Sequence, residues 1–386
     1  MDDVVVIGAG PAGSVVARLL ALRGLKVRLL ERAAFPKRKP CGESLNPGAV
    51  AALARVGTPA ESLLADGAGE LDGGIVRGWR LANNRLRLEA SYPPGRYGIG
   101  CRRELLDERL VREACRAGVL LDEHMHVEGI VWNELGHAAG VYGRSAATGK
   151  PFRLPARLVV GADGLRSAIA RSAGLASRPG RLRKAAFTAR LIGVEALEDA
   201  VELHTEPDLV VGVAPLGGGL ANLTLALQGA AAASAAKDKA GFMLEAARRQ
   251  PWLAERLAGA ALAGEVLASG PFDRPVRAAA LPGLVLVGDA AGYYDPLTGQ
   301  GIYRAIRSAE LAAPRVAESL ASGSFRPLAQ YERERRKEFA PGVRLQRLIE
   351  WSSRQPPVWN AALRGLSASP RLKEALAGRI GDCRVP

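Results

Sequence analysis

The chain has 386 residues, of which 48% are hydrophobic, and it carries a formal net charge of +14 at pH 7. This length predicts two to three domains with a sizeable core, and no apolar run reaches the roughly 18 residues of a membrane-spanning helix, so we expect a cytoplasmic protein. The basic excess would suit nucleic acid, an anionic membrane or an anionic substrate, but solvated arginine-rich faces explain it more simply, and without a nucleic-acid-binding signature we expect no nucleic acid.

The first residues predict a β-strand, an α-helix and a second β-strand. Residues 4–7 form a short β-branched run, residues 11–23 carry apolar side chains at helical spacing, and residues 26–31 (KVRLLE) are typical of a second strand. Together they predict a β-α-β unit, in which a helix connects two parallel strands.

The later elements follow from similar patterns. Residues 74–90 alternate between apolar and polar side chains around Asn83 and Asn84, which predicts a hairpin. The remaining predictions are a helix at 103–117, short strands over 127–160 and over 185–227, an alanine-rich piece at 229–236 that leads into a helix near 238–260, a buried strand at 284–287, a long helix at 301–320 and a basic helical region from about 330 to 386.

The turn after the first strand has the spacing of a dinucleotide-phosphate cradle. Gly8, Gly10 and Gly13 form G-x-G-x-x-G, and Glu31 ends the second strand 21 positions after Gly10. Glycines at these positions allow a tight turn and a close approach to a diphosphate at the helix N-terminus, and the carboxylate accepts hydrogen bonds from the ribose. The motif indicates a dinucleotide but does not distinguish FAD from NAD.

Two more stretches indicate a flavin. They are LVVGADGLRSAIAR at 158–171 and LVLVGDAAGYYDPLTGQGIYRAI at 284–306. With the first motif they resemble the glutathione-reductase-like FAD superfamily, in particular the branch of class A flavoprotein monooxygenases, geranylgeranyl reductases and flavin-dependent halogenases. The resemblance covers residues 1 to about 310 and implies an α/β fold: a Rossmann-like FAD-binding domain with an interleaved β-sheet substrate domain.

The resemblance also assigns roles around the cofactor. Asp289 would hold ribityl hydroxyls, and the helix opened by residues 299–302 would direct its N–H groups at the flavin pyrimidine. A single cradle implies that NADPH or NADH binds only transiently, or that a separate flavin reductase supplies electrons. The cofactor-binding residues implied are Gly8, Gly10, Ala12, Gly13, Glu31, Arg32, Arg103, Asp163, Gly164, Gly288, Asp289, Pro296, Gly299, Gln300, Gly301 and Ile302.

Three flavin chemistries compete within this branch. Halogenases carry W-x-W-x-I-P, which is absent here, and the reductases carry Y-x-W-x-F-P, which aligns with VVGVAP. Pro215 is kept, but the smaller Val210, Gly212 and Ala214 replace the three aromatic residues, which leaves room for a bulkier substrate. We therefore expect a monooxygenase that uses molecular oxygen and a flavin C4a-hydroperoxide to hydroxylate an apolar or aromatic small molecule.

Two alternatives stay open. The first is a geranylgeranyl-reductase-like reductase or dehydrogenase acting on an isoprenoid or polyketide. The second is a non-enzymatic, flavin-bound basic protein that binds nucleic acid or a membrane surface.

The sequence offers few catalytic side chains. Cys41 and Glu43, in KPCGES, are the candidates, because the corresponding segment of the family crosses toward the flavin ring and geranylgeranyl reductases have a Cys-Gly pair in a similar place. His204 is a further candidate acid or base, although we expect it in an exposed loop. His124 and His126 share one face of a predicted strand but have no third ligand nearby, so we expect no metal.

The C-terminal region combines apolar helical faces with many basic residues. It would pack onto the FAD domain, or act as a lid or a peripheral membrane contact that delivers an apolar substrate. The predicted division is an FAD-binding domain of residues 1–65, 97–178 and 276–330, a substrate domain of residues 66–96 and 179–275, and a C-terminal helical segment of residues 331–386.

Overall fold

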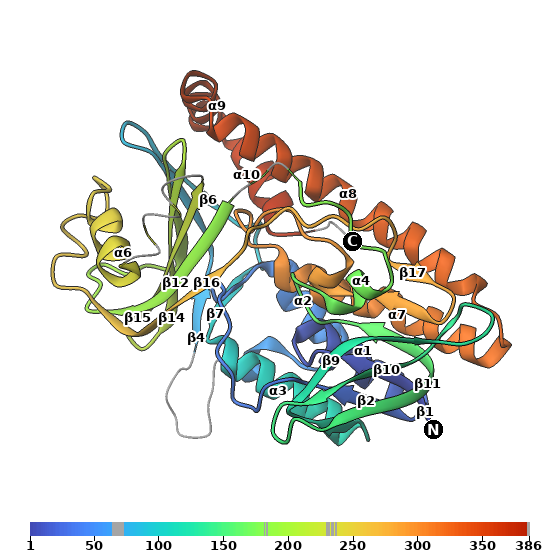
Figure 1. Ribbon diagram of the computed structural model, residues 1–386. Helices are drawn as coiled ribbons and strands as arrows, with labels where there is room; N and C mark the ends of the chain where they lie inside the picture. Colours follow the sequence, from blue (N-terminus) through green and yellow to red (C-terminus); the bar gives the residue numbers. More distant parts are fainter. Residues whose placement is uncertain are drawn as a thin grey trace.

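The computed structural model describes residues 1–63, 73–180, 182, 184–228, 232, 235 and 238–383. Two main sheets lie side by side, and a long helical arm crosses the molecule above them (Figure 1). The larger sheet has helices packed on it, and a smaller joining sheet lies between the two. This arrangement confirms the predicted α/β fold.

The larger sheet has eight strands and a parallel centre. Its main order is β17-β18-β11-β1-β2-β8, and β9 and β10 extend β11 as an antiparallel ribbon. The centre is buried and β-branched, as parallel strands covered on both faces require. Its strands are β1 (Asp2–Ile7), β2 (Val27–Leu30), β8 (Leu120–Asp122), β9 (Met125–Trp132), β10 (Ala138–Ser145), β11 (Pro151–Gly161), β17 (Ala280–Leu281) and β18 (Leu284–Leu286).

Helices α1 and α3 begin at the predicted residues, whereas α2, α4 and the two 3-10 helices were not predicted. Between β1 and β2, helix α1 packs against α3 and α7, which confirms the β-α-β unit. The helical elements before the C-terminal arm are α1 (Pro11–Ala21), α2 (Pro47–Arg55), α3 (Arg103–Arg116), α4 (Ala168–Ser172) and the short 3-10 helices η1 (Ala60–Leu63) and η2 (Gly288–Ala291).

The second sheet has seven strands in the order β16-β12-β15-β14-β13-β5-β6. Helix α6 (Lys239–Arg248) covers one face, and the predicted helix over 238–260 was too long because turns follow Arg248. Most of the alanine-rich piece lies outside the described residues. The strands are β5 (Gly78–Ala82), β6 (Arg87–Ser91), β12 (Lys184–Ile192), β13 (Ala200–Thr205), β14 (Leu209–Gly217), β15 (Leu220–Gln228) and β16 (Ala261–Ser269).

A three-stranded sheet joins the two halves. It consists of β3 (Ser44–Leu45), β7 (Gly98–Cys101) and β4 (Gly73–Val76). The predicted hairpin around Asn83 is therefore confirmed for β5 and β6, whereas the residues just before β5 belong to this joining sheet. All strands of the seven-stranded sheet come from residues 66–96 and 179–275, as the predicted division expects, although the domain boundaries themselves stay a prediction.

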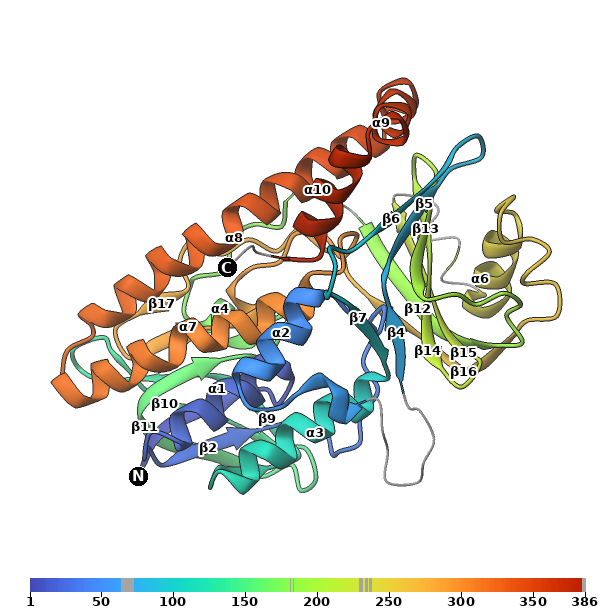
Figure 2. The same cartoon turned by 180° about the vertical axis from the view of Figure 1, so that it is seen from behind.

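The C-terminal arm contacts both sheets. It consists of α7 (Gly301–Ser322), α8 (Arg326–Ser353), α9 (Pro356–Ala368) and α10 (Pro370–Ile380). Figure 2 shows α8 running past α7 to carry α9 to the edge of the molecule, where α10 folds back. Trp359 and Leu363 of α9 pack with Trp79 and Leu81 of β5. In the part of the chain that is described, none of these helices is apolar over the length that a bilayer crossing needs.

Candidate functional site

A cavity of about 610 Å³ lies where the two sheets and the C-terminal helices meet. Its lining is largely apolar and includes residues from all three motifs, which lie far apart in the sequence. The structure therefore brings the predicted cofactor residues to one place. Those that line the cavity are Gly10, Ala12, Arg103, Gly164, Gly288, Asp289, Pro296, Gly299, Gly301 and Ile302.

The three glycines of the first motif differ in their surroundings. A Cβ on Gly8, whose φ is +95°, would lie 2.5 Å from the carbonyl oxygen of Ala162, and a Cβ on Gly13 would lie 1.8 Å from the carbonyl oxygen of Gly8. The nearest described atom to a Cβ on Gly10 is Nζ of Lys39, at 3.9 Å. The chain's own packing therefore requires Gly8 and Gly13, whereas Gly10 faces open space that a diphosphate would occupy.

Glu31 lies at the end of β2, as the sequence predicts. It accepts hydrogen bonds from the backbone N–H of Ala9 (2.9 Å) and of Ala33 (3.1 Å) and pairs with Lys37. Burial raises the pKa of Glu31, but the charge and hydrogen bond of Lys37 together with the backbone N–H groups outweigh it, and the net shift is downward. An ionised acceptor thus stands where a ribose would bind. Arg32 is exposed and its side chain makes no hydrogen bond or ion pair with described residues, so its cofactor role stays a prediction.

The second motif caps the short helix α4 and lies beside Lys39, a cation that was not among the predicted cofactor residues. Asp163 accepts from the N–H groups of Ala168 (2.6 Å) and Ile169 (3.2 Å) at the start of α4. Next to it, a Cβ on Gly164 would lie 3.6 Å from Nζ of Lys39, the same ammonium that faces Gly10. Lys39 is therefore in reach of a diphosphate between the two glycines, and the basic run before Cys41 was the signal for it.

Asp289 lies in η2, directly after β18, and lines the cavity. Among the described residues none donates a hydrogen bond to its carboxylate. Burial raises the pKa of Asp289, and the positive charges of Lys39 and Arg103 offset part of this rise. An acceptor without a partner, facing the cavity at the end of a parallel strand, fits the ribityl hydroxyls of FAD. With Gly10, Glu31 and Lys39, the residues present fit this cofactor.

Gln300 was predicted to contact the cofactor, but its side chain joins a different set of contacts, which we call the C-terminal clasp. Its Nε2 donates to Oδ1 of Asp382 (2.8 Å) and to the carbonyl oxygen of Arg379 (3.2 Å). Asn46, the N-cap of α2, donates to Oδ2 of Asp382 (2.8 Å) and to the carbonyl oxygen of Ile380 (3.0 Å). The clasp fixes the N-terminal end of α7, which carries the predicted flavin contacts, to the end of α10.

A buried ion cluster holds the loop that precedes Pro296. Nζ of Lys184, on β12, lies 2.9 Å from Oδ2 of Asp295 and 2.5 Å from Oε2 of Glu350, on α8. All three residues are less than 5% exposed. Gln228 donates to the other carboxylate oxygen of Glu350 at 2.7 Å. The cluster therefore ties together the seven-stranded sheet, the loop that carries the predicted cofactor residue Pro296, and the C-terminal arm.

Arg103 begins α3, as predicted, and is buried rather than solvated. Its guanidinium makes a bidentate pair with Asp107, with N–O distances of 2.9 to 3.1 Å. Burial lowers the pKa of Arg103, but Asp107 and the neighbouring sulfur of Cys41 raise it by more, and the guanidinium stays charged. Arg103 thus presents a fixed positive charge to the cavity beside Cys41.

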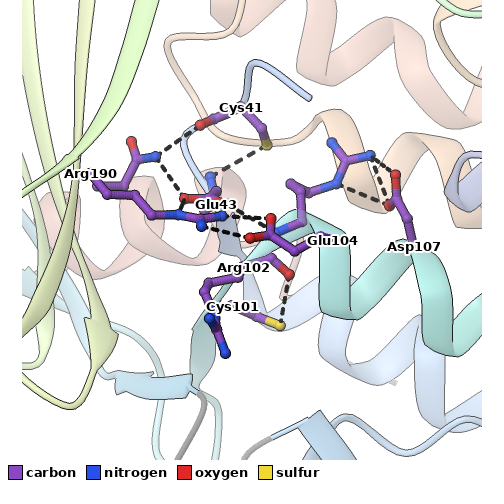
Figure 3. Close-up of polar contacts among 9 residues, drawn as sticks. Cys41, Glu43, Cys101, Arg102, Glu104, Asp107 and Arg190 are labelled. Atoms are coloured by element: carbon purple, nitrogen blue, oxygen red, sulfur yellow. Dashed lines mark hydrogen bonds and ion pairs between the residues drawn. The ribbon is translucent and has the colours of Figure 1, made fainter. Parts of the chain in front are cut away.

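The two candidate catalytic residues have different environments (Figure 3). Cys41 lines the cavity, and its carbonyl oxygen accepts from Asn222 at 3.0 Å. Glu43, with a φ of +53°, is 4% exposed, and its carboxylate accepts from Asn222, from the N–H of Arg103 and from the guanidinium of Arg190. Arg190 also pairs with Glu104. These donors occupy both oxygens of Glu43, so the geometry favours a role in positioning the loop over a role in proton transfer.

Replacing Cys41 with alanine is expected to leave FAD binding unchanged and to alter turnover only. The substitution removes the sulfur, which lines the cavity and accepts one hydrogen bond from the N–H of Glu43 at 3.3 Å. It keeps the carbonyl oxygen of Cys41 and the carboxylate of Glu43, which hold the loop through Asn222, Arg103 and Arg190. Flavin absorbance of the purified variant measures cofactor content, and steady-state kinetics measure turnover. Loss of bound FAD in this variant would mean that the loop holds the cofactor through the sulfur.

The opposite wall of the cavity is formed by β14 of the seven-stranded sheet. Val210, Gly212 and Ala214 all line the cavity. Val211 and Val213, which alternate with them, pack in the core under α6, and Val213 also reaches the cavity lining. The three positions that would be aromatic in the reductase pattern therefore do face the predicted flavin side. Their small side chains widen the cavity at this wall.

The sequence predicts that His204 lies in an exposed loop, but the structure buries it on a strand. It lies on β13, is 2% exposed and has its Nε2 3.6 Å from Oε2 of Glu202. Burial raises the pKa of Glu202, but the neighbouring His204 and the hydrogen bond from Arg256 lower it to about 2. The neighbours of His204 on β13, Leu203 and Thr205, line the cavity instead. Alternation along the strand therefore directs His204 away from the cavity, and we assign it no catalytic role.

Comparison with known proteins agrees with the three motifs. The family model described as "FAD binding domain" matches residues 1–344. Digeranylgeranylglycerophospholipid reductase 2 of Methanopyrus kandleri is 31% identical over 349 residues, which cover 87% of this chain and 83% of the relative. The corresponding reductase of Methanothrix thermoacetophila is 28% identical over 348 residues, 88% of this chain and 84% of the relative. The solved structure of the myxobacterial chondrochloren halogenase CndH superposes with a TM-score of 0.82 at 25% identity, covering 99% of this chain and 95% of the halogenase.

Proposed function

Because the chain belongs to the FAD binding domain family and is a FAD-dependent oxidoreductase, we propose that it reduces carbon–carbon double bonds in an elongated apolar substrate of the isoprenoid class. The observation that carries this proposal is the cavity, which continues from the FAD-binding residues past the seven-stranded sheet to the apolar faces of α8, α9 and α10. A long hydrocarbon chain would fill such a space, with one end at the flavin and the other between the helices. The relatives named for reduction of geranylgeranyl chains support the same class.

Each residue group has a defined task in this reaction. FAD, when bound, supplies the hydride chemistry, with NADPH, NADH or a partner reductase as the predicted electron source. The apolar wall orients the alkene and excludes water. Tyr293, which lines the cavity, is our candidate for the group that adds the proton, because its hydroxyl carries a proton at neutral pH.

Hydroxylation is the second candidate, and one observation favours it. The small side chains of Val210, Gly212 and Ala214 give the cavity a width that a single prenyl chain does not require. A ring-containing substrate would use this width, as the sequence analysis expected for a monooxygenase.

Product analysis distinguishes the two candidates. The FAD-loaded protein is reduced with dithionite and mixed, without oxygen, with a detergent-solubilised lipid that carries geranylgeranyl chains. We expect products whose masses rise by two hydrogen atoms for each double bond reduced. A parallel reaction with NADPH in air tests oxygen insertion on the same lipid and on aromatic compounds. Products that gain an oxygen atom, without any hydrogenated product in the first reaction, would overturn the reductase proposal in favour of hydroxylation.

A further inference from the structure

Three side chains of the C-terminal arm line the cavity and are also exposed to solvent. They are Leu348 (58% exposed) and Trp351 (57%) on α8 and Val358 (40%) on α9. Because a residue can satisfy both conditions only where a cavity opens, they mark its mouth at the corner between α8 and α9. Large apolar side chains around an opening are unusual on a surface that meets only water.

The same corner is basic. From residue 339 to residue 373 the sequence contains one acidic residue, Glu350, and this carboxylate is buried against Lys184. Arg344, Arg347 and Arg354 are all exposed. On α8, Arg344 precedes Leu348 by four positions and Arg347 precedes Trp351 by four, so each arginine lies beside an apolar side chain of the mouth.

We propose that the corner formed by α8 and α9 docks on an anionic lipid bilayer, with Leu348, Trp351 and Val358 inserted at the interface, so that an apolar substrate passes from the bilayer directly into the cavity. The proposal rests on the proposed function insofar as that function requires a membrane-borne apolar substrate. Indole and aliphatic side chains favour the interfacial region of a bilayer, and arginines around them bind anionic headgroups. The mouth of the cavity then faces the hydrocarbon of the bilayer, and the substrate enters the cavity without passing through water.

A bilayer explains this surface better than a second copy of the chain. A two-fold contact through the corner would bring the arginines of one copy close to those of the other, and Glu350, the one carboxylate in this stretch, is buried and cannot neutralise them. Figures 1 and 2 both show α9 at the outer edge of the molecule, so the corner can approach an extended surface. The helices lie on such a surface rather than cross it, in agreement with their composition.

Flotation with lipid vesicles tests the proposal without any enzymatic readout. The FAD-loaded protein is mixed with vesicles of phosphatidylglycerol and phosphatidylcholine in equal parts, or of phosphatidylcholine alone, and no substrate is present. We expect the protein to float with the anionic vesicles and to dissociate from them at high salt. Each arginine near such a surface contributes about fivefold in partitioning, so Arg344→Glu with Arg354→Glu should reduce binding by at least about 25-fold.

The matched charge control is Lys150→Glu with Arg153→Glu, which changes the net charge by the same amount as the double variant of the corner. Both control residues are exposed and lie on or next to β11, far from α9. The apolar contribution is tested with Trp351→Ser, which removes an exposed indole from the mouth of the cavity. Its control is Trp132→Ser, which removes an exposed indole from the end of β9. We expect only the corner variants to lose vesicle binding. Equal losses in the controls would overturn the proposal, as would failure of the parent protein to float.

Two further results separate this proposal from the proposed function. The Arg344→Glu, Arg354→Glu variant should reduce detergent-solubilised lipid as fast as the parent but reduce the same lipid in vesicles at least about 25-fold more slowly, because these arginines lie outside the cavity. If the parent protein binds vesicles but does not reduce the detergent-solubilised lipid, the proposed reductase function is contradicted and the docking proposal is supported. If sedimentation shows a dimer that Trp351→Ser dissociates, and no vesicle binding occurs, the corner is a contact between copies and the docking proposal fails.

Discussion

Replacing Lys184 with methionine is expected to lower the free energy of unfolding by about 3–5 kcal/mol. The substitution keeps most of the side-chain volume but leaves two buried carboxylates, Asp295 and Glu350, facing each other without a cation. Chemical denaturation of the FAD-loaded protein, followed by tryptophan fluorescence, measures the loss. Burial lowers the pKa of Lys184, yet the two carboxylates raise it by more, so its stabilising contribution is complete at neutral pH and is lost only as the pH rises through the raised pKa.

Two controls show whether the loss comes from the buried charges. Arg249→Met removes a cation from its pair with Glu245, where the two side chains are 72% and 62% exposed. It should lower the free energy of unfolding far less than Lys184→Met does, because exposed ion pairs contribute little to stability. Adding Glu350→Gln to Lys184→Met should restore part of the loss, because it removes one of the two stranded charges. Equal effects of Lys184→Met and Arg249→Met would show that the cluster does not stabilise the junction.

Alanine at Gly10 and alanine at Gly13 are expected to fail in different ways. A Cβ on Gly13 would overlap the carbonyl oxygen of Gly8 at 1.8 Å, so the turn must shift, and we expect a loss of stability of about 1–3 kcal/mol even without FAD. A Cβ on Gly10 meets only the flexible end of Lys39, at 3.9 Å, so the protein should fold normally. It should nevertheless bind FAD about five- to 150-fold more weakly, because the methyl group occupies the space of the diphosphate.

Thermal unfolding of the two apo variants and fluorescence titration with FAD separate these effects. The expected pattern is normal unfolding with weak FAD binding for Gly10→Ala, and early unfolding for Gly13→Ala. Normal FAD affinity in Gly10→Ala would place the diphosphate away from this glycine. FMN, which lacks the adenosine half, serves as the reference ligand for nonspecific changes in the flavin pocket.

Much of the FAD-binding half could be predicted because its signals are local. The β-branched run before Gly8, the helical spacing after Pro11 and the strand before Gly288 each depend on a few consecutive residues, and the structure has β1, α1 and β18 at these places. The turn at Asn83 was also predictable, since its side chain accepts from the N–H groups of Arg85 and Leu86. Local hydrogen bonding of this kind is visible in the sequence.

The roles of individual polar residues depended on partners that are distant in the chain. Glu43 looked available for chemistry until Arg190, which is 147 positions away, was seen to bind it. His204 looked exposed because polar residues surround it in the sequence, but the face of β13 to which it belongs is covered by other elements. The cluster of Lys184, Asp295 and Glu350 has no local signature at all, because three separate elements contribute one charge each.

The C-terminal clasp has a consequence for the order in which the molecule assembles. Its contacts with Asn46 join residues that are 334 and 336 positions apart, whereas β1, α1 and β2 contact one another within about thirty residues. Contacts between such distant segments form slowly, because closing a long loop costs entropy before any contact is gained. The dinucleotide cradle is therefore expected to mature early and the clasp late, so that FAD can enter while the cavity still lacks its helical wall and is retained once α10 has docked.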